Sequence, residues 1–158
     1  MAMRIAQFFD KDCIRLCLIE SNRLLPLDFD GDMIDFIESK SKPETVSNPI
    51  AFDRVKLAPP VTRPSKIIAL GLNYKDHADE GKGKIPDVPL IFAKFPSSII
   101  GHNDQIRWDT NVTQKVDFEA ELAVIIGKKV YNLPETEALG AVFGYTCSND
   151  VRALEKIN

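Results

Sequence analysis

The sequence contains little cysteine and histidine, and it has no long apolar run. Its 158 residues include three cysteines, two histidines and one tryptophan. An odd cysteine count argues against a disulfide framework and favours reduced thiols. No apolar stretch reaches the length of a membrane span, and residues 1–7 run into Asp10 and Lys11 too early to hold the apolar core of a signal peptide. We therefore expect a cytoplasmic protein that has no membrane partner.

Neither sign of charge dominates the sequence. The chain has 20 Lys and Arg residues against 23 Asp and Glu residues, and its formal net charge is −3. This balance lacks the basic excess of a nucleic-acid-binding surface or a polybasic membrane patch, so we expect no nucleic-acid partner. The hydrophobic fraction of 44% and the charged fraction of 27% are typical of a soluble globular protein.

The first third of the chain predicts a small α+β module. Alternating apolar residues favour three short strands, at residues 4–9, 13–20 and 23–27. Apolar residues at helical spacing follow at 33–37, and Asp30 or Asp32 precedes them as a candidate N-cap. Cys13 and Cys17 lie in an apolar alternating segment without a nearby histidine. We interpret them as small buried hydrophobic residues rather than metal ligands.

A proline-rich stretch divides the chain. Pro59, Pro60 and Pro64 exclude a helix there, and we place a domain boundary in this stretch. The N-terminal module then covers residues 1–60 and a second domain covers residues 61–158. The second domain is expected to contain strands at residues 65–70, 90–94, 105–108 and 141–147, and a short helix within residues 131–139.

The most informative stretch covers residues 115–127, where strict alternation leads into an apolar run. Alternation is typical of a half-buried strand, because successive side chains point to opposite faces. One face carries the apolar residues Val116, Phe118, Ala120, Leu122 and Val124. The other carries Asp117, Glu119 and Glu121. Cα atoms two residues apart on a strand are about 6.6 Å apart, so Glu119 and Glu121 can converge on one cation.

Two interpretations of this acidic face remain open. Oxygen-only ligands indicate Mg²⁺, Mn²⁺ or Ca²⁺ rather than Zn²⁺. The plainer interpretation, which the pattern alone favours, is the solvent-exposed face of an antiparallel strand.

Four side chains outside this strand are further candidates for chemistry. His77 and Glu80 are three residues apart, so one helical turn would place them on one face, where the carboxylate makes the imidazole a better general base. The alternative for this pair is a solvated surface turn. Lys94 ends an apolar strand and is either a substrate-facing cation or a snorkelling edge residue. Asp150 follows a predicted strand, either as a third metal ligand or as an ordinary turn residue.

Four short motifs occur in a fixed order along the rest of the chain. They are Gly-Leu-Asn-Tyr at residues 71–74 with His77 and Glu80, Pro-Leu-Ile-Phe-Ala-Lys at 89–94, Val-Asp-Phe-Glu-Ala-Glu-Leu at 116–122 with Ile126 and Gly127, and Gly144-Tyr145 with Asn149-Asp150-Val151. In this order and spacing, residues 63–151 resemble the fumarylacetoacetate hydrolase family. Residues 1–60 also resemble the short leading domain of its bacterial-type members.

The resemblance implies both a fold and a site. The fold is α+β, a mixed β-sandwich roll that is C-terminally incomplete here and follows the small N-terminal module. The resemblance implies that Glu119, Glu121 and Asp150 bind Mg²⁺ or Mn²⁺, with Ca²⁺ as a further candidate. It also implies that His77 and Glu80 form a water-activating pair on a mobile lid. Lys94 is then expected to bind the carboxylate of the substrate.

The same resemblance implies an enzyme that acts on small oxo acids, commonly as a homodimer. The leading prediction is hydrolysis of a C–C bond in a 2,4-dioxo acid, such as an acylpyruvate or a fumarylacetoacetate-like compound. Isomerisation, hydration or decarboxylation of a related oxo-dienoate is the alternative, and a catalytically silent metal-binding fragment is the alternative of another class. The chain departs from the family pattern after Asp150, where a small residue, an Arg-Asp pair and a glutamine are typical. Here Val151-Arg152-Ala153-Leu154 follows.

Overall fold

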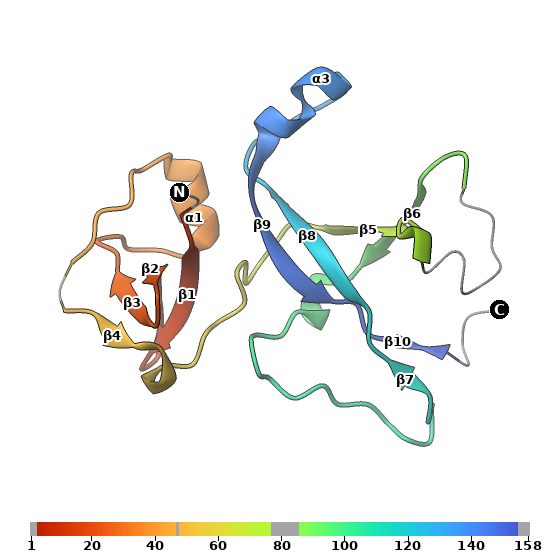
Figure 1. Ribbon diagram of the computed structural model, residues 1–158, viewed down its shortest axis with the longest axis horizontal. Helices are drawn as coiled ribbons and strands as arrows, with labels where there is room; N and C mark the ends of the chain where they lie inside the picture. The colour runs from red at the N-terminus through yellow and green to blue at the C-terminus, as the bar shows by residue number, and fades with distance from the viewer. Residues whose placement is uncertain (1–2, 47, 77–85, 155–158) are drawn as a thin grey trace.

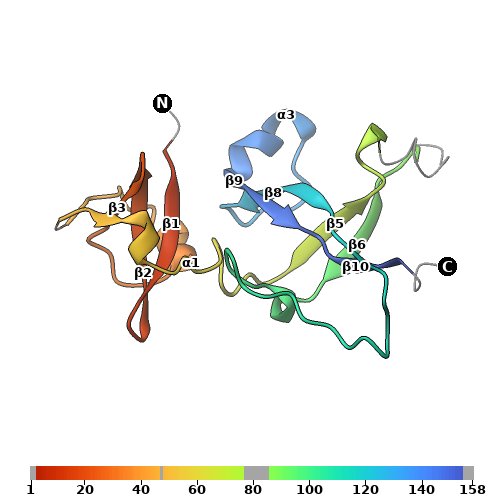
Figure 2. The same cartoon turned by 60° about the horizontal axis from the view of Figure 1, so that its bottom comes forward.

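The structure, a computed structural model, describes residues 3–46, 48–76 and 86–154. Figure 1 shows a four-stranded sheet with one α-helix at one end and three strand pairs at the other, joined by a single extended segment. Figure 2 shows the same division from a second angle. Within the described ranges, no helix is both long enough and apolar enough to cross a membrane.

The sheet at the N-terminal end is built from local antiparallel pairs. Its strands lie in the order β1 (Ile5–Asp10), β2 (Cys13–Glu20), β3 (Arg23–Pro26) and β4 (Ile50–Ala51). Polar turns with Lys11 and Ser21 in the left-handed conformation join the first three strands. The helix α1 (Met33–Ser39) and the 3-10 turn η1 (Phe52–Arg54) complete this part. The strands and the helix predicted for the first third of the chain are confirmed.

The buried core packs this sheet against α1. One cluster joins sheet and helix and contains Leu16, Leu27, Met33 and Phe36, and a second contains Phe8, Cys17 and Leu24. Burial raises the pKa of the Cys17 thiol to about 12, so Cys17 is the small hydrophobic residue that the sequence predicted. The same prediction is wrong for Cys13, which is exposed because it opens β2 beside the hairpin turn.

A buried glutamine connects the sheet, the helix and the linker, which is the proline-rich stretch at residues 59–64. Gln7 Nε2 donates a hydrogen bond of 2.7 Å to the carbonyl oxygen of Pro59, and Gln7 Oε1 accepts one of 2.7 Å from the backbone nitrogen of Met33. Both polar ends of this fully buried side chain are satisfied, so its burial carries no desolvation penalty from an unpaired group. Val61 and Phe143 also pack against the cluster around Leu16, which brings the two parts of the chain into contact.

The helix α1 begins with a capping box. Asp32 accepts hydrogen bonds from the backbone nitrogens of Ile34 at 2.8 Å and Asp35 at 3.1 Å, and the Asp35 carboxylate accepts one from the Asp32 nitrogen at 2.9 Å. Arg63 of the linker donates to both carboxylates. Burial raises the pKa of Asp32, but the hydrogen bonds from Arg63 and the two backbone amides outweigh it. The pKa of Asp32 therefore lies below its ordinary value.

Asp32→Ala is expected to lower the free energy of unfolding by about 1 kcal/mol, which is typical of a lost N-cap. Because the folded-state pKa of Asp32 is depressed, its contribution is present above the unfolded-state pKa and is lost as pH falls through the folded-state value. Urea unfolding at neutral pH and at about pH 3, below the ordinary Asp value of about 3.9, measures this loss. Asp28→Ala, an exposed aspartate, is the control. An equal gap between the wild type and Asp32→Ala at both pH values would contradict the prediction.

Three antiparallel strand pairs follow the linker. β5 (Ile67–Gly71) pairs with β6 (Leu90–Lys94), β8 (Ala120–Ile126) pairs with β9 (Val142–Asn149), and β7 (Val116–Asp117) pairs with β10 (Arg152–Ala153). Short helical turns lie at η2 (Pro96–Ser98), α3 (Glu135–Ala138) and η3 (Leu139–Ala141). The predicted strands around β5, β6 and β9 and the predicted short helix are confirmed.

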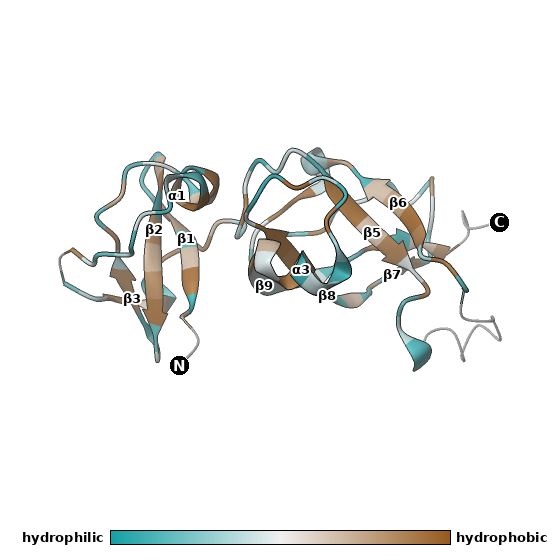
Figure 3. Cartoon of the chain, turned by 90° about the horizontal axis from the view of Figure 1, so that it is seen from above, coloured by the Kyte–Doolittle hydropathy of each residue, from teal (hydrophilic) through white to brown (hydrophobic). Residues whose placement is uncertain are grey.

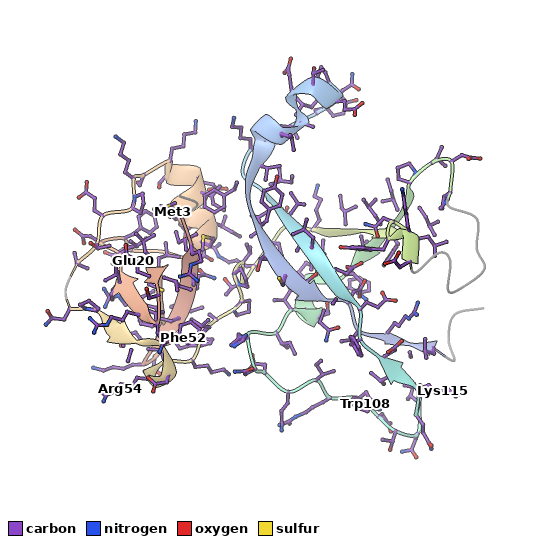
Figure 4. The ribbon with its side chains drawn as sticks, viewed as in Figure 1. Met3, Glu20, Phe52, Arg54, Trp108 and Lys115 are labelled. Carbon is purple, nitrogen blue, oxygen red and sulfur yellow. The ribbon has the colours of Figure 1, made fainter. Side chains whose placement is uncertain are left out.

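Two predictions for this part need correction. The strand expected at residues 105–108 is wrong: these residues lie in a long loop, on which Figure 4 places Trp108 and Lys115. In that loop the side chain of Arg107 donates a hydrogen bond of 2.8 Å to Gln105 Oε1. The strand expected at residues 115–127 is interrupted at residues 118–119, between β7 and β8.

The strands after the linker leave much apolar surface open. On β8 the exposed fractions of Leu122, Val124 and Ile126 are 60%, 47% and 55%. Five large apolar residues of β5 and β6 are also exposed, namely Ile68, Leu70, Leu90, Ile91 and Phe92, and Figure 3 shows the hydrophobic colour along both strands. Among the buried apolar residues of the described ranges, Ala141 alone lies beyond residue 66. The acidic side of β8 is half-buried instead, so the interpretation of that side as a solvent-exposed face is wrong.

Candidate functional site

The end of β9 returns beside the interruption between β7 and β8. The backbone nitrogen of Asp150 donates to the carbonyl oxygen of Glu119 at 2.9 Å, and the nitrogen of Glu119 donates to Asn149 Oδ1 at 3.0 Å. This hydrogen bond to the side chain of Asn149 replaces the backbone partner that the Glu119 nitrogen lacks between the two strands. This arrangement places Asp150 next to Glu119, with side chains that are 10% and 22% exposed.

Glu121 lies on β8 opposite Ser148 and is half-buried. Within the part of the chain that the structure describes, no three His, Cys, Asp or Glu side chains come together as a site for one metal ion. The structure therefore brings Glu119 and Asp150 together, and Glu121 lies two residues further along the chain, on β8. His77 and Glu80, the predicted water-activating pair, lie outside the described residues.

Two cations face the paired carboxylates. Lys94, the last residue of β6, forms an ion pair with Asp150. Arg152 Nη1 lies 2.8 Å from Glu119 Oε1, and Arg152 Nη2 lies 3.9 Å from Asp117 Oδ2. Figure 1 shows why this is possible, because β10 runs beside β7 just after β9 ends. Sequence reasoning missed this role of Arg152 and noted it only as a departure from the family pattern.

The chemistry of this donor set fits a hard divalent cation. Glu119 Oε1 and Asp150 Oδ1 are buried atoms, and among the described residues neither accepts a well-directed hydrogen bond, although each lies against a cation. Buried carboxylate oxygens of this kind demand positive charge. Carboxylate oxygens are also the ligands that Mg²⁺ and Mn²⁺ prefer.

The Gly-Leu-Asn-Tyr motif at residues 71–74 contacts β8 through its tyrosine. Tyr74 Oη accepts a hydrogen bond of 2.9 Å from the backbone nitrogen of Leu122, which directly follows Glu121. Leu72 has a φ of 52°, a left-handed conformation that is strained for a bulky residue. This turn directly follows β5, and the hydrogen bond of Tyr74 joins the residues after the turn to β8. Sequence reasoning used Tyr74 only as part of a motif and assigned it no contact.

Two open hollows of the described surface lie away from the carboxylates. One is lined by Lys56 and by residues of the loop at 100–107, and the other by residues 110–115. Glu119, Glu121 and Asp150 line neither of them. In the first, His102 lies in a turn closed by Asp104, whose side chain accepts from the Gly101 nitrogen and pairs with Lys56. We therefore place the candidate site by its chemistry, at the carboxylates, rather than by surface shape.

Comparison with known proteins identifies the family. A profile described as "Fumarylacetoacetate (FAA) hydrolase C-terminal" matches residues 66–156, more than half of the chain. The chain belongs to the fumarylacetoacetate hydrolase family. An oxaloacetate tautomerase, the mitochondrial fahd2 protein of Xenopus laevis, is 37% identical over 170 residues, which cover 97% of this chain and 53% of the relative.

Solved structures of the fumarylacetoacetate hydrolase family share the fold of this chain. The fumarylacetoacetate hydrolase of Exiguobacterium antarcticum matches with a TM-score of 0.80 at 30% identity, over 98% of this chain and 57% of that one. A maleylpyruvate hydrolase of Sphingobium, solved in complex with manganese(II) and pyruvate, matches with a TM-score of 0.73 at 24% identity, over 98% of this chain and 61% of that one. The predicted fold class, α+β of the fumarylacetoacetate hydrolase type, is confirmed. The chain spans little more than half the length of these relatives.

Proposed function

We propose that this chain carries the metal-binding part of a divalent-metal-dependent enzyme that cleaves a C–C bond in a small 2,4-dioxo acid, such as an acylpyruvate or a fumarylacetoacetate-like compound. The observation that carries the proposal is the pairing of Glu119 with Asp150, whose largely buried carboxylates face positive charge. Glu119, Glu121 and Asp150 would hold Mg²⁺ or Mn²⁺, and Ca²⁺ also suits an all-oxygen set. The Sphingobium relative, solved with manganese(II) and pyruvate, supports this choice of metal and substrate class.

The chain's own residues would carry the remaining chemistry. The bound ion would supply Lewis-acid stabilisation of negative charge on a 2-oxo acid. Lys94 would exchange its contact with Asp150 for the carboxylate of the substrate. His77, oriented by Glu80, would take a proton from water as the water oxygen adds to the distal carbonyl carbon. The C–C bond then breaks, its electron pair stays with the pyruvate part as an enolate, and this enolate takes up a proton.

The alternative is isomerisation, hydration, tautomerisation or decarboxylation of a related oxo acid. The oxaloacetate tautomerase name of the Xenopus relative favours this alternative, and the maleylpyruvate hydrolase name of the Sphingobium relative favours hydrolysis. These reactions share an enolate beside a carboxylate, so the same carboxylates and Lys94 would serve each of them. A catalytically silent metal-binding fragment is the alternative of another class.

Metal-dependent turnover tests the proposal. Acylpyruvate cleavage and loss of the oxaloacetate enol are followed by absorbance with Mg²⁺, with Mn²⁺ and with EDTA. We expect turnover of at least one substrate with metal, loss of that turnover with EDTA, and recovery when excess Mn²⁺ is added. A turnover rate that EDTA does not change would overturn the proposal. Binding of Mn²⁺ without turnover of either substrate would favour the silent fragment.

We also propose a domain boundary near residue 60, a homodimer and a cytoplasmic location. The hydrogen bond from Gln7 Nε2 to the Pro59 carbonyl oxygen supports the boundary, because the chain leaves the first sheet at this point. The open apolar side of β8 supports self-association, because exposed contiguous apolar surface commonly marks an interaction site.

A further inference from the structure

Arg152 occupies an unusual position for a cation beside a metal site. It lies two residues after Asp150, on β10, and its backbone pairs with Asp117 of β7. Its guanidinium contacts Glu119 Oε1 at 2.8 Å, the same atom that is otherwise buried without a well-directed hydrogen bond. The side chain is 30% exposed, so it has room to move towards solvent.

A metal ion and this guanidinium compete for Glu119 Oε1 in the observed arrangement. A hard divalent ion binds carboxylate oxygen at about 2.0–2.6 Å. An ion at that distance from Glu119 Oε1 would lie within a few ångströms of Arg152 Nη1, where two positive charges repel strongly in a partly buried site. Lys94 would compete with the metal for Asp150 in the same way. A lysine ammonium is a point charge on a flexible stem, however, so it leaves a carboxylate more easily than a two-pronged guanidinium does.

A second acceptor for Arg152 is already in place. Asp117 Oδ2 lies 3.9 Å from Arg152 Nη2, and the Asp117 side chain is 39% exposed. Because the two residues face each other across the β7–β10 pair, a small rotation of the arginine side chain brings it onto Asp117 without breaking the strands. Among the described residues, Arg152 thus lies near a carboxylate at the candidate metal site, Glu119, and near another at its edge, Asp117.

We propose that Arg152 acts as an internal competitor for the metal. In the metal-free protein it neutralises Glu119, and on metal binding it moves to Asp117. This inference rests on the proposed metal site and adds to it a determinant of metal affinity. Removal of Arg152 then tightens metal binding, whereas removal of Asp117 weakens it, because the displaced arginine loses its second acceptor.

The test is direct binding of Mn²⁺ to metal-depleted protein, measured through the electron paramagnetic resonance signal of the free Mn²⁺. This measurement does not depend on turnover. Arg152→Gln is expected to bind Mn²⁺ about tenfold more tightly than the wild type, a change of about 1.4 kcal/mol. Arg152→Lys keeps the charge but holds Glu119 less firmly than a guanidinium does, so it is expected to bind Mn²⁺ more tightly than the wild type and less tightly than Arg152→Gln. Arg107→Gln, which removes an exposed loop arginine, is the matched control.

A double-mutant cycle separates competition from simple charge effects. Asp117→Asn is expected to weaken Mn²⁺ binding in the wild type and to have little effect when Arg152 is already glutamine, because coupled residues are non-additive. If Arg152→Gln binds Mn²⁺ as tightly as the wild type or more weakly, the inference is overturned but the proposed metal site stands. Absence of Mn²⁺ binding in both proteins, with far-UV circular dichroism showing that both are folded, overturns the inference together with the metal site.

Discussion

Glu121→Gln is expected to weaken Mn²⁺ binding at least about a hundredfold and to abolish metal-dependent turnover. Loss of a hydrogen bond that supports a metal ligand costs about 10–100-fold, and loss of a ligand should cost more. The variant tests the member of the donor set that lies apart from the pair, because the structure places Glu119 beside Asp150 and leaves Glu121 further along β8. Convergence of all three would require the side chain of Glu121 to turn towards the pair when the ion binds.

The measurement is Mn²⁺ binding to metal-depleted protein, with Glu137→Gln as the matched control. Glu137 is an exposed carboxylate on α3, so its loss changes net charge equally without touching the site. Asp150→Asn is expected to lose as much affinity as Glu121→Gln, and it also removes the partner of Lys94. If Glu121→Gln binds Mn²⁺ as tightly as the wild type, the ion uses only the pair of Glu119 and Asp150.

The first third of the chain could be predicted closely because its signals are local. The hairpin between β1 and β2 follows from alternation around a polar turn, and α1 follows from helical spacing behind a capping aspartate. Such features depend on residues a few positions apart. Gln7 was not predicted, because its partners Met33 and Pro59 are distant in sequence and nothing in an alternating strand marks one polar residue as buried.

The candidate site shows where sequence pattern fails. Alternation correctly placed Glu121 and Leu122 on opposite sides of β8, but it could not decide which side is covered. That choice depends on what packs there, and here the residues brought to the acidic side come from the ends of β6, β9 and β10. The ion pairs of Lys94 and Arg152 are products of this topology, so spacing along the chain could not reveal them. The family motif located the carboxylates, and only the structure located their counter-charges.

Extending the chain by the part of the domain that its relatives possess is expected to stabilise it and to raise turnover by about a hundredfold or more. The strands after the linker expose apolar side chains such as Leu122, Val124 and Ile126. Fully burying a side chain of this kind stabilises by about 1.5–3 kcal/mol, so covering these half-exposed groups should contribute several kcal/mol in total. The Exiguobacterium structure contains chain beyond the 57% that this protein matches, and that additional chain is a candidate cover.

The expected gain in turnover has a separate physical origin. Glu119, Asp150 and Lys94 supply metal ligands and a cation, but they do not supply walls that hold a substrate and exclude water. Loose positioning alone costs about a hundredfold in rate, and electrostatic stabilisation weakens in a wet site. A fusion of residues 1–154 to the remaining segment of the Exiguobacterium hydrolase can be compared with the 158-residue chain by thermal unfolding, acylpyruvate turnover and mass from light scattering.

Leu122→Lys with Val124→Lys provides the control for surface burial. In the fusion these substitutions should remove most of the added stability, because they place charges where the new segment packs. In the 158-residue chain alone they should cost little stability and should reduce self-association, because the two side chains are 60% and 47% exposed there. A 158-residue chain that is monomeric, unfolds cooperatively at high temperature and turns over acylpyruvate as fast as the fusion would contradict the prediction. The open side of β8 would then be a tolerated surface, and the carboxylates with Lys94 would suffice to hold the substrate.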